Sequence, residues 1–300
     1  MASRAILVTT MNPAIAVESL SFAWPGSAPL FGGLSFEVAR GESMAVVGAS
    51  GSGKSSLLAL LAGLEKPAAG RILVDGEELA RPRPGTGLVL QDHGLLPWAT
   101  IRDNVALGAK VRRFYGPDGL HAPPAPLAQM KGKTPMPRKS PEKRARRAAR
   151  TAPEDDRAVE AWLERLGIDS IAGAWPSRVS GGQRQRAAIA RSLVLEPDII
   201  LMDEPFASLD EATREDLRAL TLEIRAERGM TLVFVTHSID EALIVGDRIL
   251  LLEGRSAGTE STGAADAAET RYRLFANSPG DMATRAGLKA ALRAALGAAS

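Results

Sequence analysis

The sequence predicts an α/β protein whose core is a mainly parallel sheet with helices on both faces. Strands and helices alternate along much of the chain, which is the order that such sheets require. Residues 199–202 form a continuous apolar run beside a turn, a pattern typical of a strand buried on both faces. Hydrophobic residues make up 45% of the 300-residue chain and charged residues 24%, which excludes a wholly disordered protein.

The expected elements follow in chain order. Strands are expected over residues 43–47, 71–74, 87–90, 199–202, 231–236 and 248–252. Helices are expected over about residues 53–64, 186–195, 211–227 and 282–296. Between about residues 101 and 191 no strong strand is apparent, and Val159, Trp162, Leu163 and Leu166 recur at helical spacing. We therefore expect a mostly helical subdomain, about residues 92–195, inserted in the α/β core.

The composition excludes several kinds of site and segment. The chain has no cysteine, so disulfides, thiolate metal sites and cysteine nucleophiles are excluded. It has three histidines, which argues against a histidine-rich metal site. No apolar run approaches the roughly 18–20 residues that span a bilayer. Residues 1–12 are expected to form a tail and not a secretion signal, because their apolar patch is short and interrupted.

The basic charge is concentrated in one segment. Residues 110–150 contain 12 Lys or Arg and 2 Asp or Glu, whereas the rest of the chain carries a net charge of −8. Residues 112–153 are also rich in proline and poor in large apolar residues, so we expect a mobile loop, with a basic helix possible over residues 141–150. This insert could be a solvated loop, or it could contact anionic lipid, a partner or nucleic acid. Residues 254–300 are expected to form a linker and a terminal helix.

The strongest local signal is Gly-Ala-Ser-Gly-Ser-Gly-Lys-Ser at residues 48–55, between a strand and a helix. The glycines let backbone N–H groups curl around phosphate oxygens, and the helix start adds partial positive charge. Lys54 would reach the β- and γ-phosphates, and Ser55 would ligate Mg²⁺. The predicted phosphate contacts are Gly48, Ser50, Gly51, Ser52, Gly53, Lys54, Ser55 and Ser56.

Two further patterns point to nucleotide chemistry. The strand at residues 199–202 delivers Asp203 and Glu204 at its carboxyl end, where open α/β sheets place ligands. Asp203 can hold Mg²⁺ through water, and Glu204 can polarise an attacking water. Ser180, Gly181, Gly182 and Gln183 precede a helix, with Ser180 as its cap, and form a second anion site. One nucleotide needs one phosphate loop, so the second site is expected to serve the nucleotide of another copy.

Taken together and in this order, these residues resemble the ATP-binding cassette (ABC) ATPases over about residues 15–253, the basic insert excepted. The resemblance implies an ABC-type nucleotide-binding domain, residues 13–253, of the P-loop NTPase class, with an N-terminal antiparallel β subdomain and an inserted α-helical subdomain. Residues 48–55 resemble the Walker A loop of this family and residues 199–204 its Walker B strand. Residues 179–183 resemble the signature motif, with valine where leucine is usual.

The resemblance also implies roles for single residues. Gln91 matches the glutamine that touches Mg²⁺ and the attacking water, and His237 matches the switch histidine at the γ-phosphate. Asp210, in residues 208–210, matches the D-loop at the dimer interface. Trp24 stands where the family stacks a ring, usually tyrosine, on adenine. The cofactors implied are ATP and Mg²⁺, with Glu204 as the base and ATP held between the phosphate loop of one subunit and the signature motif of the other.

The sequence Leu-Leu-Pro-Trp at residues 95–98 resembles the importers for nitrate, sulfonates, taurine and related solutes. An exposed patch of this kind suits docking of a permease helix. The resemblance thus implies a second ATPase subunit, a permease docked near Leu95–Trp98, an extracytoplasmic solute-binding protein acting indirectly, and a peripheral place on the cytoplasmic face of the membrane.

Other functions of the same fold remain open from the sequence. One is a soluble ABC ATPase that acts on nucleic acid or ribosomes through the basic insert. Such proteins usually carry two cassettes or a long coiled coil, whereas this chain has one Walker A loop and no sustained heptads. Few aromatic residues interleave the basic ones, which weakens the case for nucleic acid. The other is a nucleotide-gated clamp without hydrolysis, which the presence of Glu204 and His237 disfavours.

Overall fold

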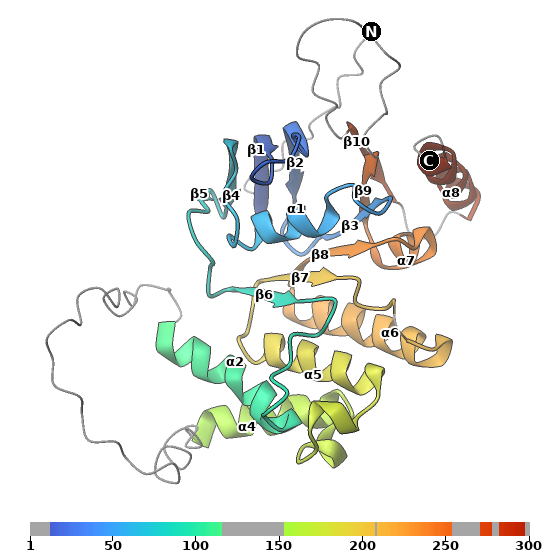
Figure 1. Cartoon of the computed structure of the whole chain (residues 1–300). Helices are drawn as coiled ribbons and strands as arrows, with labels where there is room; N and C mark the ends of the chain where they lie inside the picture. The colour runs from blue at the N-terminus through green and yellow to red at the C-terminus, as the bar shows by residue number, and fades with distance from the viewer. Residues whose placement is uncertain (1–12, 116–152, 208, 254–270, 278–281, 298–300) are drawn as a thin grey trace, which may run out of the picture. The chain divides into compact units, whose positions relative to one another are not determined.

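The computed structural model describes residues 13–115, 153–207, 209–253, 271–277 and 282–297, which form two compact units. The first unit comprises the chain up to Gln91 and from Asp198 onward, and the second is Asp92–Pro197. In the described parts of the chain, no helix is long and apolar enough to cross a membrane. Figure 1 shows the course of the chain.

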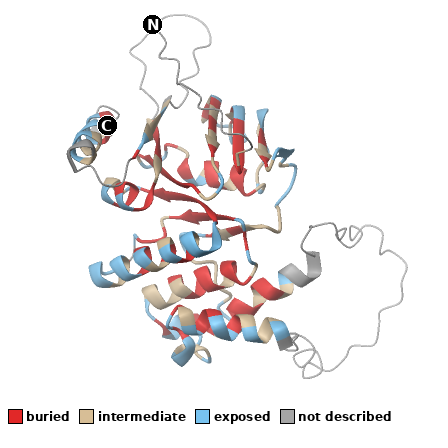
Figure 2. Cartoon of the chain, turned by 180° about the vertical axis from the view of Figure 1, so that it is seen from behind, coloured by how far each residue is buried: buried red, intermediate tan, exposed pale blue. Residues whose placement is uncertain are grey.

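A six-stranded sheet forms the centre of the first unit (Figure 1). Its strands, in spatial order, are β10 (Arg271–Ala276), β9 (Arg248–Glu253), β3 (Ser43–Gly48), β8 (Thr231–Thr236), β7 (Ile199–Asp203) and β6 (Thr86–Val89). Every neighbouring pair is parallel except β10 with β9. β3, β7 and β8 are buried along their whole length, as the red strands of Figure 2 show. Because the strands are parallel, the residues that follow β3, β6, β7 and β8 meet at one edge.

Helices cover both faces of this sheet, as the sequence predicts. Met44 and Val46 of β3 share one core cluster with the leucines of α1 (Lys54–Leu61). Ala45 points to the opposite face, because side chains alternate along a strand. There it faces Gly246, at the end of α7 (Ile239–Val245). The remaining helices of this unit are α6 (Glu211–Arg228) and α8 (Met282–Gly297), the latter packed on α7 and β9.

The predicted antiparallel β subdomain is present. Its four strands, in spatial order, are β2 (Phe31–Val38), β1 (Ile15–Phe22), β4 (Ala69–Val74) and β5 (Glu77–Glu78). Apolar side chains of β1, β2 and β4 join the core cluster that contains α1. The strand ranges expected from the sequence do not include β1 and β2. In β1 a bulge interrupts the alternation, and Ser19 there has a φ of +47°.

The second unit is helical in its described part. It contains α2 (Ile101–Tyr115), α4 (Pro153–Arg165), the short 3₁₀ helices η2 (Asp169–Ile171) and η3 (Pro176–Arg178), and α5 (Gly181–Leu193). The three α-helices pack on one another around a buried apolar seam. Gly108 lets α2 approach α5 closely, because a Cβ there would overlap the carbonyl oxygen of Arg191.

Some predicted boundaries differ from those observed. α5 begins at Gly181 and not at residue 186, because Ser180 caps it directly, and α1 ends at Leu61 and not at residue 64. Strand β10, which has one neighbour only, was not predicted. The expected mobile loop of residues 112–153 is helical at both ends, because α2 ends at Tyr115 and α4 begins at Pro153. The tail at residues 1–12, the basic helix at 141–150 and the linker at 254–270 lie outside the described residues.

Candidate functional site

The phosphate loop turns sharply between β3 and α1. Gly53 caps the helix with a left-handed backbone, at a φ of +96°, which favours glycine. Lys54 is the first residue of the helix, and its ammonium group donates to the carbonyl oxygens of Gly48 and Ala49, both at 2.9 Å. The lysine therefore lies over the loop, with its donors directed at the space that the loop encloses. Burial lowers the pKa of Lys54, and the charges of Glu204 and Asp203 oppose this effect.

Asp203 ends strand β7 as a buried carboxylate with an unused acceptor. Its Oδ1 atom has no hydrogen-bond partner in the structure. Burial raises the pKa of Asp203, whereas a hydrogen bond from Ser55 lowers it. Among the described residues, no cluster of three or more His, Asp or Glu side chains could hold a metal ion.

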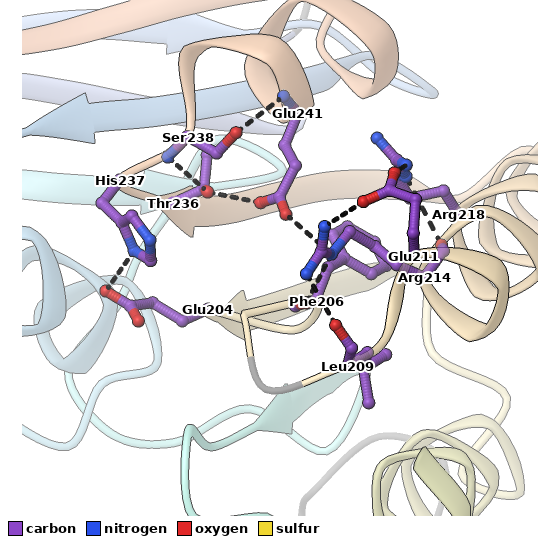
Figure 3. A network of polar contacts seen from close by, with 10 residues as sticks. All are labelled: Glu204, Phe206, Leu209, Glu211, Arg214, Arg218, Thr236, His237, Ser238 and Glu241. Carbon is purple, nitrogen blue, oxygen red and sulfur yellow. Dashed lines mark hydrogen bonds and ion pairs between the residues drawn. The ribbon is translucent and has the colours of Figure 1, made fainter. Parts of the chain in front are cut away.

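Three side chains meet at the carboxyl edge of the sheet. Glu204 follows β7, Gln91 follows β6, and His237 follows β8, so adjacent strands bring them together. The amide of Gln91 donates to Glu204 Oε2 at 3.2 Å. On the other side, His237 Nδ1 lies 3.4 Å from Glu204 Oε1, as Figure 3 shows. Glu204 adopts a φ of +46°, unusual for a residue with a side chain. A glutamate held between an amide and an imidazole is suited to orient and deprotonate a water.

Trp24 lies just beyond β1 and beside α1. Its indole N–H donates to Ser56 Oγ at 3.1 Å, and its ring packs edge-on against Phe22 at a centroid distance of 5.2 Å. The side chain is nevertheless 42% exposed. These two contacts fix the edge of the ring, so an accessible ring is held next to the helix that follows the phosphate loop.

Residues 180–183 belong to the second unit and form a tight helix start there. The Ser180 hydroxyl accepts from the backbone N–H of Gln183 at 3.2 Å, and the Ser180 N–H donates to the Gln183 side chain at 2.9 Å. These reciprocal bonds make a capping box. Gly181 and Gly182 stand at the helix start, where backbone N–H groups are not used within the helix. The described site in the first unit contains Trp24, the phosphate loop, Gln91, Asp203, Glu204 and His237.

Asp210 has a local role in the structure. It caps α6 by accepting from the backbone N–H of Thr213 at 3.0 Å, and this bond lowers the pKa of Asp210. The side chain is exposed. Ser208, in the same predicted motif, lies outside the described residues.

The sequence reasoning missed a polar network behind the site (Figure 3). Arg214, in the first turns of α6, and Glu241, in α7, lie between the segments that carry Glu204 and His237. Ser238 and Glu241 have the Ser-x-x-Glu spacing of a capping box, which could have drawn attention to this segment. Ser238 does accept from the Glu241 backbone N–H, but the Glu241 carboxylate binds Thr236 instead of closing the box.

A loop from Asp92 to Thr100 opens the second unit and is held by buried polar groups that the sequence reasoning also missed. Asn104, which is fully buried, accepts from the N–H of Leu96 at 2.7 Å and donates to three carbonyl oxygens of this loop. Arg191, in α5, donates to the carbonyl oxygens of His93 at 2.8 Å and Gly94 at 2.6 Å. The loop is therefore tied both to α2 and to the helix that begins at Gly181.

The apolar residues of this loop are only partly exposed. Leu95 and Leu96 are half-buried, whereas Pro97 and Trp98 are exposed, Trp98 to 71%. The expected exposed patch at residues 95–98 is thus centred on Trp98, the most exposed large apolar side chain in the described part of the chain.

Comparisons with known proteins show similarity to one family. The family model described as ABC transporter matches residues 31–207. The chain is 40% identical over 224 residues to the taurine import ATP-binding protein TauB of Pseudomonas aeruginosa, which covers 75% of this chain and 72% of that protein. It is 37% identical over 229 residues to the aliphatic sulfonates import ATP-binding protein SsuB of Escherichia coli K12, covering 76% and 73%.

Solved structures show the same fold. The chain matches cbiO1 from Clostridium perfringens, part of the ABC transporter complex cbiONQ, with a TM-score of 0.64 at 25% identity, covering 94% of this chain and 96% of that one. It also matches a dimeric ATP-binding cassette in a post-hydrolysis state with ADP and phosphate bound, with a TM-score of 0.61 at 24% identity, covering 88% and 99%.

Proposed function

Because the chain belongs to the ABC transporter family and is an ATP-hydrolysing subunit of it, we propose that it energises the import of taurine or another aliphatic sulfonate through a membrane permease. The observation that carries the ATPase part of this proposal is the meeting of Glu204, Gln91 and His237 beside the phosphate loop. The solute rests on the similarity to the taurine and sulfonate import proteins.

The nucleotide is held from three sides in this proposal. Trp24 stacks on the adenine ring with its exposed face. Residues 48–56 surround the phosphates with backbone N–H groups and with the start of α1. Lys54 exchanges its bonds to the carbonyl oxygens of Gly48 and Ala49 for bonds to the β- and γ-phosphates. Because those carbonyls are part of the loop itself, phosphate binding also changes how the loop is held.

The residues present fit a magnesium ion. Asp203 offers a buried acceptor without a partner, and Ser55 lies within hydrogen-bond reach of it, so both supply the oxygen ligands that Mg²⁺ prefers. Gln91 contributes its amide oxygen from the neighbouring strand end. The bound ion would offset the negative charge of the β- and γ-phosphates.

Glu204 is the proposed base. The attacking water donates its proton to Glu204 as its oxygen bonds to the γ-phosphorus, and the bond from that phosphorus to the departing ADP oxygen breaks. Gln91 and His237 hold the carboxylate from both sides, at 3.2 and 3.4 Å, and so fix the direction from which water is taken. His237, whose side chain is 64% exposed, is also free to contact the γ-phosphate.

A second copy of the chain completes the site. The capped helix start at Ser180–Gln183 presents backbone donors to an anion, and the first unit already has its own phosphate loop. We therefore infer a head-to-tail homodimer in which Ser180, Gly181, Gly182 and Gln183 of one subunit face the γ-phosphate bound to the other. Asp210, next to the turn after β7, lies at the interface in this arrangement.

The permease docks on the loop from Asp92 to Thr100. Asn104 and Arg191 hold its backbone, so Trp98 is presented on an ordered support and little conformational entropy is lost on docking. Arg191 lies in the helix that starts at the anion site of residues 181–183. This helix and the hydrogen bonds of Arg191 to His93 and Gly94 would connect the anion site to the docking loop. The subunit would thus lie peripherally on the cytoplasmic face of the membrane, and a solute-binding protein would act indirectly through the permease.

The test compares the wild type with Glu204→Gln. Purified wild-type chain should hydrolyse ATP in the presence of Mg²⁺, whereas the variant should bind ATP, dimerise and lose most turnover. Protein recovered from detergent-solubilised native membranes should bring a multi-spanning permease with it. Wild-type turnover in the variant would contradict the role of Glu204, and ribosomal or DNA-bound partners without a permease would favour the nucleic-acid function.

A further inference from the structure

A partly buried ion pair, between half-buried Arg214 and buried Glu241, joins the two chain segments that carry Glu204 and His237. Glu241, on α7, accepts a 2.5 Å hydrogen bond from Thr236 Oγ1, the residue just before His237. Its other carboxylate oxygen lies 3.9 Å from Nε of Arg214 on α6 (Figure 3). We call these three residues the Arg214–Glu241–Thr236 bridge.

On the α6 side, Arg214 of the bridge is hydrogen-bonded to the chain segment that follows Glu204. Arg214 donates to the carbonyl oxygen of Phe206 at 3.2 Å and to that of Leu209 at 2.6 Å. It also donates to Glu211 at 2.5 Å, and Glu211 in turn binds Arg218. The guanidinium group thus holds a turn that begins two residues after Glu204.

On the α7 side, the bridge fixes the residues on both sides of His237. Thr236 Oγ1 donates to Glu241 and also accepts from the backbone N–H of Ser238 at 3.0 Å. Ser238 Oγ accepts from the backbone N–H of Glu241 at 3.3 Å. His237 itself is exposed at its side chain, so its backbone is held while its ring stays accessible.

We propose that Arg214, Glu241 and Thr236 are positioning residues that set the spacing between Glu204 and His237, and through it the rate of ATP hydrolysis. This inference rests on the proposed function of that site. Glu204 and His237 come from different strand ends, and their 3.4 Å contact needs both loops to hold one arrangement. A backbone hydrogen bond from the Glu204 N–H to the Val235 carbonyl oxygen, at 3.0 Å, already joins the two strand ends. The bridge adds a side-chain connection between the loops beyond them, and its printed contacts do not involve the phosphate loop.

The chemistry of the bridge limits which residues could replace its members. Arg214 serves two carbonyls and two carboxylates at once, which the planar fork of arginine allows and the single ammonium of lysine does not. Thr236 uses its hydroxyl as donor and acceptor together. Serine would keep both bonds, whereas valine would keep the shape and lose both.

The kinetic test uses Arg214→Gln with Arg225→Gln as a matched control. Arg225 lies on the same helix and also serves a carbonyl and a carboxylate, Gly41 and Asp247, but these lie at the amino end of β3, away from the site. Arg214→Gln should lower kcat at least tenfold while the affinity for a fluorescent ATP analogue stays within twofold. Arg225→Gln should lower the melting temperature with kcat within twofold of wild type.

Two further variants separate positioning from general damage. Thr236→Ser should keep at least half of the wild-type kcat, whereas Thr236→Val should lose as much as Arg214→Gln. In a His237→Ala background, Arg214→Gln should cost no more than a further twofold, because the spacing that it sets no longer exists. The proposal would be overturned if the fold-losses in kcat of Arg214→Gln and His237→Ala multiplied fully in the double variant. Equal kcat for Thr236→Ser and Thr236→Val would also overturn it.

A spectroscopic readout makes the inference independent of turnover. The chain has three histidines, so the ring signals in a proton–nitrogen spectrum are few, and His237→Ala assigns the one of interest. Arg214→Gln and Thr236→Val should shift the His237 ring signal, whereas Arg225→Gln should leave it in place. If the His237 signal does not move in these variants, the positioning role of the bridge is wrong, even if the wild type hydrolyses ATP. If the signal shifts but the wild type does not hydrolyse ATP, the proposed function is wrong and the positioning role stands.

Discussion

Replacing Asn104 should uncouple the subunit from its permease while sparing the ATPase site. Asn104 is fully buried in α2, and its side chain makes four hydrogen bonds to the loop that carries Trp98. Alanine removes all four bonds. Aspartate keeps the acceptor for the Leu96 N–H but turns an oxygen, in place of the amide donor, toward three carbonyl oxygens.

The magnitude follows from what each change leaves unpaired. In Asn104→Ala the N–H of half-buried Leu96 loses its partner, which costs at most about 1–3 kcal/mol. The carbonyls of Leu96 and Thr100 keep backbone donors, from Ala99 and Asn104 respectively, so they add little. A shift of about 1–3 kcal/mol lowers the ordered fraction of the loop, and with it the permease affinity, by at most about 5- to 150-fold. Asn104→Asp should destabilise the loop more than Asn104→Ala, because it adds a charge at a fully buried position.

The assay measures ATP turnover of the chain alone and of the chain reconstituted with its permease. Both Asn104 variants should keep the unstimulated rate within twofold and lose the permease-dependent rate, aspartate more than alanine. Val105→Ala is the control, since Val105 is the next residue of α2, is equally buried, and lies in the apolar seam. Undiminished permease-dependent turnover in Asn104→Asp, or an equal loss of it in Val105→Ala, would show that Asn104 does not support docking.

Three other predictions concern the nucleotide site. Trp24→Ala should weaken ATP binding by about 5- to 150-fold, because stacking on a base contributes about 1–3 kcal/mol, whereas Trp24→Phe should keep most of the affinity; equal titration curves for Trp24→Ala and wild type would remove the ring from the site. Gly53→Ala should lose ATP binding at least tenfold, since its φ is +96° and a Cβ would lie 2.8 Å from the Phe31 ring, and unchanged affinity would contradict this. Asp203 has a raised pKa, so the native state binds its proton more tightly than the unfolded chain, and the ligand-free protein should lose stability as pH rises from 3.8 through the raised pKa. Asp203→Asn should remove this loss. In EDTA, the melting temperature of the variant should therefore exceed that of the wild type by a margin that grows as pH rises over this range. A lower melting temperature of the variant at pH 7 would contradict the raised pKa of Asp203.

The parts of the site that the sequence predicted are those set by short continuous stretches. The phosphate loop must be a strand, a glycine turn and a helix in succession, so residues 48–55 determine it locally. Asp203 and Glu204 were predicted for the same reason, since they directly follow a buried strand. Gln91 and His237 each follow a strand, and the parallel order of β6, β7 and β8 brings them to Glu204. Their roles came from the resemblance.

The parts that were missed depend on contacts between distant segments. Arg214 and Glu241 stand on different helices, and nothing in the residues around either one specifies the other. In the sequence, Asn104 is an ordinary polar residue of a helix, although its buried side chain supports the loop from Asp92 to Thr100. The half-burial of Leu95 and Leu96 was missed for the same reason, because it depends on contacts with residues distant in the sequence. Hydrogen bonds from Asn104 and Arg191 hold the loop against the helices of the second unit.

The uptake of labelled taurine by cells tests the central claim most directly. A strain that lacks this chain would receive the wild type or Glu204→Gln, and uptake would be compared with that of a labelled alkanesulfonate and of nitrate. We expect the wild type to restore sulfonate uptake and Glu204→Gln to restore none, although it still assembles with the permease. Equal uptake with the two forms, or restored uptake of nitrate alone, would contradict the account.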